Sequence, residues 1–227
     1  MAEKFSPGIQ GFGTDLCSTF LQNLPISGVS ISAFPGHAPE TSICASDATS
    51  ARIDELQFDL GEGPRWEALR TRGPVAIPNV KSAGHTAWPV FAKALLDLDV
   101  SALFVFPLVL GAMDIGIVEL YSTSPGPLSS PDHSMALQLT DSVAWKLLQH
   151  ILTVAPGDNL GPSRDGSLLS RREVHQATGM VLAQTGTSAT DALLLLRAHA
   201  FSEGLTVREV ARDVVSKTLD FTPPKAG

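Results

Sequence analysis

The sequence predicts an α+β protein of two domains, a larger one built on an antiparallel sheet and a smaller one made of three helices. Two features of the sequence support this prediction. Proline, glycine and small polar residues crowd into 154–166 and interrupt every periodic pattern there, as is typical of a linker. Strand-like and helical patterns are mixed before this segment, whereas only helical periodicity follows it. We therefore expect a first domain over 1–153, a helical domain over 167–221 and a disordered tail over 222–227.

The first domain is expected to contain both helices and strands. Apolar residues recur at helical spacing in the segments 14–23, 51–56, 65–71, 89–96 and 131–152. Alternating or β-branched runs, bounded by glycine and proline, occupy 28–34, 41–45, 74–80, 102–110 and 115–121. A short turn separates the last two runs, which favours a hairpin of neighbouring strands.

The helix expected over 131–152 carries a wide apolar face. Its members follow one another at four-residue spacing: Met135, Leu139, Val143, Leu147 and Ile151. This face is wider than one small sheet requires, so together with the opening helix it predicts a homodimer. The alternative is that the face packs on the sheet of its own domain.

Three helices with recognisable ends are expected in the second domain. The first spans about 168–184 and ends at Gly186. Capping boxes begin the other two helices at Ser188 and Thr206, and Gly204 ends the second helix. The expected core combines apolar positions from all three helices: Val174, Met180, Leu193, Leu196, Val207, Val210 and Val214.

Charge is distributed unevenly along the chain. The formal net charge is −7, so the whole chain is a poor non-specific binder of nucleic acid. Half of the basic residues nevertheless lie after residue 163, where they slightly outnumber the acidic ones. The first 163 residues are thus acidic, whereas the helical domain that follows is nearly neutral.

The cysteine content and the hydropathy pattern favour the cytoplasm. Only two cysteines occur, Cys17 and Cys44, and both are expected to be reduced thiols in the core. The sequence has no apolar stretch of membrane-spanning length and no leader pattern at its start. We therefore expect a cytoplasmic protein without a membrane partner.

Motifs of catalytic and cofactor sites are missing from the sequence. The segment 61–64 lacks the lysine of a phosphate-binding loop, and neither a nucleophile elbow nor a zinc-binding histidine pair occurs. Asp54, Glu55, Asp59 and Glu62 lie close together, but without a metal-binding spacing they are interpreted as an exposed acidic helix. We expect no enzyme activity, no cofactor and no metal site.

Two stretches of the first domain resemble a GAF domain of the type found in actinobacterial regulators. They are Ile43-Cys44-Ala45-Ser46-Asp47, continuing through 54–64, and Phe106-Pro107-Leu108, followed by 116–121. The resemblance covers about 13–151. It implies an antiparallel sheet with a small-molecule pocket on one face and dimerising helices on the other.

Large aromatic residues are candidate walls of this pocket: Trp66, Trp88, Phe91 and Phe104. A filled core accounts for the same residues. The Asn-Lys-Phe-Asp-Glu motif of cyclic-nucleotide GAF domains and a cysteine placed for bilin attachment are both missing. The resemblance therefore leaves the small-molecule ligand unknown.

The second domain resembles the ANTAR module of antitermination regulators over about 168–219. The resemblance rests on Arg171-Arg172-Glu173-Val174-His175-Gln176-Ala177-Thr178-Gly179-Met180-Val181-Leu182, on 192–200 and on Glu209-Val210-Ala211. Modules of this family bind paired RNA stem-loops in nascent transcripts as dimers, so that a terminator does not form. Many family members have lysine where this chain has Gln176 and Thr178.

Candidate RNA-binding residues lie on all three helices. Guanidinium, imidazole, amide and hydroxyl groups suit phosphates and loop bases. The candidates are Arg171, Arg172, His175, Gln176, Thr178, Arg197, His199, Arg208 and Arg212. A solvated charged face explains any single one of them, but as a set they favour a macromolecular partner.

The sequence therefore predicts a transcription antitermination regulator that senses a signal through its first domain and binds stem-loop RNA through its second. Two alternatives remain. The helices on either side of 203–206 also fit a helix-turn-helix DNA-binding regulator. A sensor or interaction protein without nucleic-acid binding would bind neither RNA nor DNA.

Overall fold

The computed structural model describes residues 9–34, 40–82, 87–153 and 171–222. The chain divides into two compact units, one lying within 1–170 and the other containing 171–227. The linker predicted over 154–166 lies outside the described residues. So does the predicted tail, except for its first residue.

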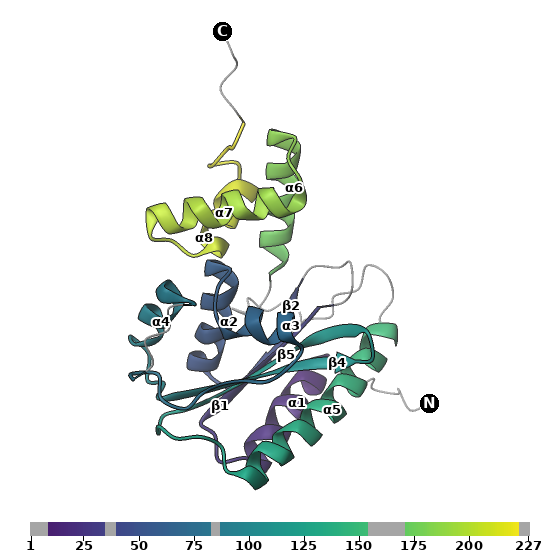
Figure 1. The fold of residues 1–227 in the computed structure, drawn as a ribbon. Coiled ribbons are helices and arrows are strands. Elements are labelled where there is room, and N and C mark those ends of the chain that lie inside the picture. Colours follow the sequence, from purple (N-terminus) through teal and green to yellow (C-terminus); the bar gives the residue numbers. More distant parts are fainter. Residues whose placement is uncertain (1–8, 35–39, 83–86, 154–170, 223–227) are drawn as a thin grey trace. The chain divides into compact units, whose positions relative to one another are not determined.

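A five-stranded antiparallel sheet forms the centre of the first unit (Figure 1). Its strand order is β2-β1-β5-β4-β3. The strands are β1 (Gly28–Ala33), β2 (Thr41–Ala45), β3 (Val75–Ile77), β4 (Ala102–Leu110) and β5 (Met113–Ser122). β4 and β5 form the predicted hairpin, with Phe104 opposite Leu120. The edge strands are β2 and β3.

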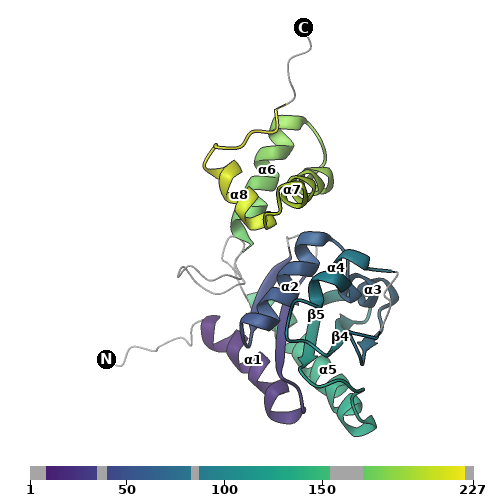
Figure 2. The ribbon, with the colours of Figure 1, turned by 90° about the vertical axis from the view of Figure 1, so that its left-hand side faces the viewer.

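Helices cover both faces of this sheet (Figures 1 and 2). α1 (Ile9–Asn23) and α5 (Ser130–Thr153) lie on one face, whereas α2 (Ala48–Leu60), α3 (Pro64–Thr71) and α4 (Pro89–Leu95) lie on the other. α2 begins earlier than predicted because the Asp47 carboxylate accepts a hydrogen bond from the Ser50 N–H at 2.8 Å and caps the helix. The predicted α+β class is confirmed.

The main hydrophobic core lies between the sheet and the pair α1 and α5. It includes Phe20 of α1 and both Val143 and Leu147 of α5. The middle of the predicted apolar stripe of α5 is therefore covered by the sheet of its own domain. The alternative of packing within the domain therefore holds for the central residues of the stripe, and the homodimer stays a prediction.

Cys17 of α1 and Cys44 of β2 form a disulfide within this core. The expectation of two reduced thiols is therefore wrong, although both residues are buried as expected. Their pairing depends on how α1 packs across β2. The sequence separation of 27 carries no signal for that arrangement.

The second unit consists of α6 (Arg172–Thr185), α7 (Ala189–Glu203) and α8 (Val207–Val215), with no strand between 171 and 222. The predicted caps are present: the Ser188 side chain accepts from the Asp191 N–H, and Thr206 forms a complete capping box with Glu209. Gly186 and Gly204 end α6 and α7 in the left-handed conformation, with φ of 69° and 67°.

The core of the second unit differs from the predicted one at two positions. Met180 and Leu193 are only half-buried. Small residues lie at the helix contacts instead, and these are Ala177, Ala192, Ala200 and Ala211. The helices approach one another closely on alanines, so less room remains for the longer side chains.

Within the part of the chain that the structure describes, none of the helices combines the length and apolar character that a bilayer crossing requires.

Candidate functional site

A group of charged and polar side chains is buried on the sheet face beneath α2 and α3. Successive side chains of a strand point to opposite faces. Because Val29 and Ile31 of β1 join the apolar core, Ser30 and Ser32 face the opposite side, where Ser30 meets Glu119 of β5 and Ser32 meets Asp54 of α2. We call this group the Arg65 cluster: Arg65, Asp54, Glu119, Glu40, Gln57, Ser30 and Ser32.

The Arg65 side chain, from α3, is completely buried and contacts three carboxylates. Its Nε and Nη2 atoms donate to the two oxygens of Glu119 at 3.1 and 2.7 Å, respectively. Nη1 donates to Glu40 at 2.5 Å, and Nη2 also donates to Asp54 of α2. The two-point pairing with Glu119 fixes the plane of the guanidinium group against β5.

Neighbouring residues hold these carboxylates in place. Ser30 donates to Glu119 at 3.0 Å, and Ser32 donates to Asp54 at 2.7 Å. Gln57 donates its amide to Glu119 and accepts from the Arg65 backbone N–H at 2.8 Å. Gln57 therefore joins the first turn of α3 to the sheet.

Gly63 allows this close approach of α3 to Gln57. It precedes the helix with φ of 129°, a conformation that side chains disfavour. A Cβ atom at this position would lie 2.5 Å from Gln57 Oε1. The Gly63-Pro64-Arg65 segment thus places the arginine directly over the sheet.

Electrostatic attraction keeps the arginine charged. Burial opposes the charge of Arg65, but attraction to the surrounding carboxylates outweighs burial and raises the pKa of the guanidinium. Burial also raises the pKa of the Glu119 carboxyl, and Arg65 offsets only part of this effect. The Glu119 carboxyl therefore takes up a proton at higher pH than an exposed glutamate does.

The acidic stretch of α2 is not the exposed face that the sequence predicts. Asp54 is 2% exposed and bonded to Arg65, and Glu62 accepts from the Phe91 N–H at 2.7 Å. The expectation of a solvated acidic helix is therefore wrong for Asp54, whereas Glu62 lies after the end of α2 and is half-buried. No group of three or more histidine, cysteine or acidic side chains suited to a metal ion occurs among the residues described.

The aromatic residues predicted to line a pocket do not all lie on one face. Phe104 belongs to the core beneath α1 and α5, opposite the Arg65 cluster. Phe91 is buried in α4, and Trp88 is half-buried just before that helix. The Trp66 indole donates to the Gln57 carbonyl at 3.1 Å, next to the cluster.

Sequence reasoning missed the Arg65 cluster itself. The alternation of Val29, Ser30, Ile31 and Ser32 could have indicated the cluster, because β1 lies between two other strands of the sheet. On a central strand covered by helices on both sides, the polar face is also buried and needs polar partners. One hydroxyl on this face, Ser42 Oγ, is buried without a hydrogen-bond partner among the described residues.

In the second unit, arginines gather where α8 packs against the start of α6. Arg208 pairs with Glu173 at 3.7 Å, and Arg212 lies one turn further along α8 and is exposed. Arg172 is exposed at the start of α6, whereas Arg171 is 9% exposed. The N-terminus of α6 adds partial positive charge at this end. The side chains there suit an anionic partner.

The remaining candidates differ in how accessible they are. Gln176 is exposed and lies one turn after Arg172, next to the half-buried His175. The Thr178 hydroxyl donates back to the Val174 carbonyl at 2.7 Å. On α7, Arg197 is half-buried.

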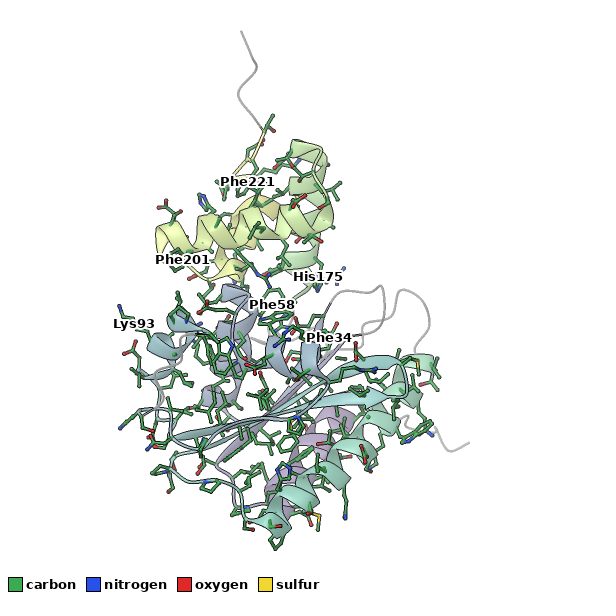
Figure 3. All side chains as sticks on the ribbon, viewed as in Figure 1. Phe34, Phe58, Lys93, His175, Phe201 and Phe221 are labelled. Carbon is green, nitrogen blue, oxygen red and sulfur yellow. A yellow bond between two sulfur atoms is a disulfide. The ribbon has the colours of Figure 1, made fainter. Side chains whose placement is uncertain are left out.

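The last candidate, His199, contacts the end of the described chain. Its ring meets Phe221 edge-on, with the ring centroids 5.6 Å apart, and Figure 3 labels Phe221. His199 is therefore half-buried, whereas Arg172 and Gln176 of α6 and Arg212 of α8 are exposed.

The first unit is an α+β domain with a buried charged cluster on one sheet face, and comparison with known families identifies it. The GAF domain model matches residues 9–145, more than half of the chain, and the ANTAR domain model matches residues 166–215. The chain therefore belongs to the GAF domain family, and its GAF domain is followed by an ANTAR domain. This combination describes a sensing regulator with an RNA-binding module. Comparison with curated proteins gave no match.

Solved structures agree with this assignment of the fold. The GAF domain of a two-component sensor histidine kinase from Bacillus halodurans is 12% identical, with a TM-score of 0.51, covering 65% of this chain and 98% of that one. The GAF domain from a phosphoenolpyruvate-protein phosphotransferase of Coxiella burnetii is 14% identical, with a TM-score of 0.51, covering 64% of this chain and 85% of that one. At these identities the likeness concerns the fold alone.

Proposed function

We propose that this chain is a cytoplasmic transcription antitermination regulator without enzyme activity. Its ANTAR domain binds stem-loop RNA in nascent transcripts, and its GAF domain controls that binding in response to a signal. The observation that carries the proposal is the ANTAR match over 166–215, which contains the arginines of α6 and α8. Antitermination requires contact with RNA during transcription, so the proposal places the protein in the cytoplasm.

The exposed side chains of α6 and α8 support an RNA-binding surface. Arg172, Gln176 and Arg212 are accessible to a partner, whereas Arg171 is nearly buried. Phosphate contacts give affinity and salt dependence, while contacts to bases give sequence preference. We assign Arg172 and Arg212 to phosphates and Gln176 to a loop base.

A double variant tests the phosphate contacts. Arg172→Ala with Arg212→Ala should weaken binding to the cognate stem-loop and flatten its salt dependence, since each lost contact removes about 0.7 to 0.9 from the logarithmic slope. The matched control is Arg70→Ala with Lys146→Ala, which removes the same charge from exposed positions of the GAF domain. Equal affinity and slope in the two double variants would exclude this surface.

A single variant tests the base contact. Gln176→Ala should reduce the preference for the correct loop and leave the salt slope unchanged, because it removes no charge. Competition gel shifts with cognate and mutated loops measure this preference. Melting temperatures equal to that of the parent show that each variant is folded.

The same gel shifts separate the alternatives. Binding to duplex DNA in preference to stem-loop RNA would favour a helix-turn-helix regulator. Binding to neither would favour a sensor that acts only through protein contacts.

We also propose that the chain acts as a homodimer. The α5 surface that faces away from the sheet carries large apolar residues that remain in water: Leu137, Trp145 and Leu152 are 40%, 58% and 75% exposed. Pairing of two copies is the commonest way to cover such a stripe. Trp145→Glu should yield a monomer in sedimentation experiments, whereas Lys146→Ala should not. A parent that sediments as a monomer at micromolar concentration would exclude the dimer.

A polar small molecule is the ligand class that the Arg65 cluster supports for the GAF domain. The buried side chains of the cluster are hydroxyls, carboxylates, a guanidinium and an amide, and Ser42 offers a further buried hydroxyl on the same sheet face. Thermal shift screening of polar metabolites measures this, because a ligand of the folded state raises the melting temperature. Shifts confined to apolar compounds would contradict the assignment.

A further inference from the structure

We propose that Cys17 and Cys44 form a thiol–disulfide switch through which oxidants control the docking of α1 on β2. The inference rests on the proposed function in one respect: a protein that binds nascent RNA works in a reducing compartment. Disulfides are rare there and mostly transient or redox-sensing. A disulfide at this position therefore calls for a regulatory explanation.

A need for additional folding stability does not explain the disulfide between Cys17 and Cys44. Disulfides compensate for small cores in short secreted domains. The GAF domain instead has a continuous core that extends from α1 through the sheet to α5. The disulfide fastens the helix at the edge of that core, beside an edge strand, rather than its centre.

Two neighbouring contacts hold α1 on β2. Cys17 is bonded to Cys44, and Gly13, one turn earlier on the same side of the helix, lies against Ile43. A Cβ atom added at Gly13 would lie 2.5 Å from the Ile43 carbonyl oxygen and 3.5 Å from Cys44 Cβ. The helix therefore sits directly on the edge strand only while position 13 has no side chain.

Access to the sulfur atoms depends on the position of α1. Cys17 and Cys44 are 4% and 7% exposed, so a thiol or an oxidant reaches them only when α1 lifts from β2. Oxidation removes two electrons and two protons from the thiols. A disulfide oxidant accepts them and becomes two thiols, whereas a hydroperoxide accepts them and becomes an alcohol and water. Reduction by a dithiol reverses the step.

A ring contact links α1 to the end of α5. Phe12 of α1 stacks on His150 in the last turn of α5, with the ring centroids 4.2 Å apart. Burial lowers the pKa of His150 and so favours the neutral ring in this contact. Because α5 is the last described helix before the ANTAR match, a change in α1 docking alters the described helix from which the chain continues toward the RNA-binding module.

The test uses the full chain in glutathione buffers of varied redox poise, without denaturant. Maleimide labelling and mass spectrometry count the thiols, and hydrogen exchange measures the opening of α1. We expect reversible conversion between a disulfide and two thiols. Amides of 9–23 should exchange about tenfold faster in the reduced state, since the bond restricts local opening. A bond that opens only in denaturant, or equal exchange in both states, would overturn the proposal.

Two sets of variants separate the switch from a general loss of stability. Gly13→Ala pushes α1 away from Ile43 and should speed reduction of the bond about tenfold, because the open state is more populated. The matched control is Gly11→Ala, where an added Cβ meets nothing within 4 Å. Cys17→Ala with Cys44→Val should exchange like the reduced parent and ignore oxidants. Equal reduction rates in the two glycine variants, or a cysteine-free variant that still responds, would contradict the switch.

RNA affinity of the oxidised and reduced parent tests the connection to the proposed function. Different affinities support control of the ANTAR domain by the switch, and equal affinities would overturn that control. If neither state binds any stem-loop, the RNA-binding proposal fails. The exchange data then still decide whether α1 docking responds to redox state.

Discussion

The two faces of the GAF sheet are both buried, yet they are held by opposite kinds of interaction. Beneath α1 and α5 the contacts are apolar, whereas beneath α2 and α3 buried apolar residues such as Ile53 and Val105 surround an arginine that binds three carboxylates. All six residues of β1 are buried, so its valine, isoleucine and serine side chains all lie in the interior. An alternating strand pattern therefore does not identify a water-exposed face when helices cover both sides of the sheet.

The two faces should respond differently to mutation. Apolar burial is non-directional and is lost in proportion to the area removed. A buried ion pair leaves uncompensated charge when one partner is removed, which costs far more than the net contribution of the pair. Substitutions on the two faces should therefore differ in the size and in the pH dependence of the stability that they remove.

Arg65→Met should cause the largest loss of stability. Without the guanidinium, three carboxylates stay buried without their counter-charge, and removal of one partner of a buried pair costs about 3–5 kcal/mol. Urea denaturation of the parent and the variant measures the free energy of unfolding.

The control for this prediction is an exposed ion pair. Arg52 and Glu55 lie 2.8 Å apart with side chains 40% and 33% exposed. Arg52→Ala should cost no more than about 1 kcal/mol, because water screens such a pair. Similar losses from the two arginine variants would show that the cluster is not electrostatically distinct from the surface.

Leu147→Ala should destabilise the apolar face by about 3 kcal/mol through lost burial and the cavity that remains. Leu147 is fully buried between α5 and the sheet. The loss should be the same from pH 5 to pH 8, since no charge is involved. A loss of stability that varied with pH would contradict the prediction that this face is held by apolar contacts alone.

Glu119→Gln should change the pH dependence of stability more than its magnitude. Burial raises the pKa of Glu119 above its ordinary value of 4.5, so the folded state binds this proton more tightly than the unfolded state. The stability that this proton contributes is fully present at pH values below the pKa of Glu119 in the unfolded state. It is lost as the pH rises toward the pKa of Glu119 in the folded state. In that window the parent should lose up to about 1.4 kcal/mol per pH unit relative to the variant.

Denaturation curves across the acidic and neutral range measure this effect. Parallel pH profiles for the parent and Glu119→Gln would contradict the raised pKa. Ser18→Ala, on the exposed side of α1, is a control that changes a hydroxyl without changing a titrating group.

Local features of the chain determined the elements and the class of fold. The capping pairs at Ser188 and Thr206, the glycines that end α6 and α7, and the hairpin of β4 and β5 all depend on residues a few positions apart. Such interactions are visible in sequence because their geometry is fixed by neighbouring residues. The family resemblances were equally local, since they rest on short motifs.

Tertiary packing decided what lies inside and which distant residues meet. Asp54 and Glu119 are 65 positions apart and share one guanidinium only because α2, α3 and β5 converge on the same sheet face. Cys17 meets Cys44 because Gly13 lets α1 lie on β2. Charged and polar residues that look solvated in the sequence become interior where two layers of helices cover both faces, since burial depends on the whole arrangement rather than on the neighbours in the chain.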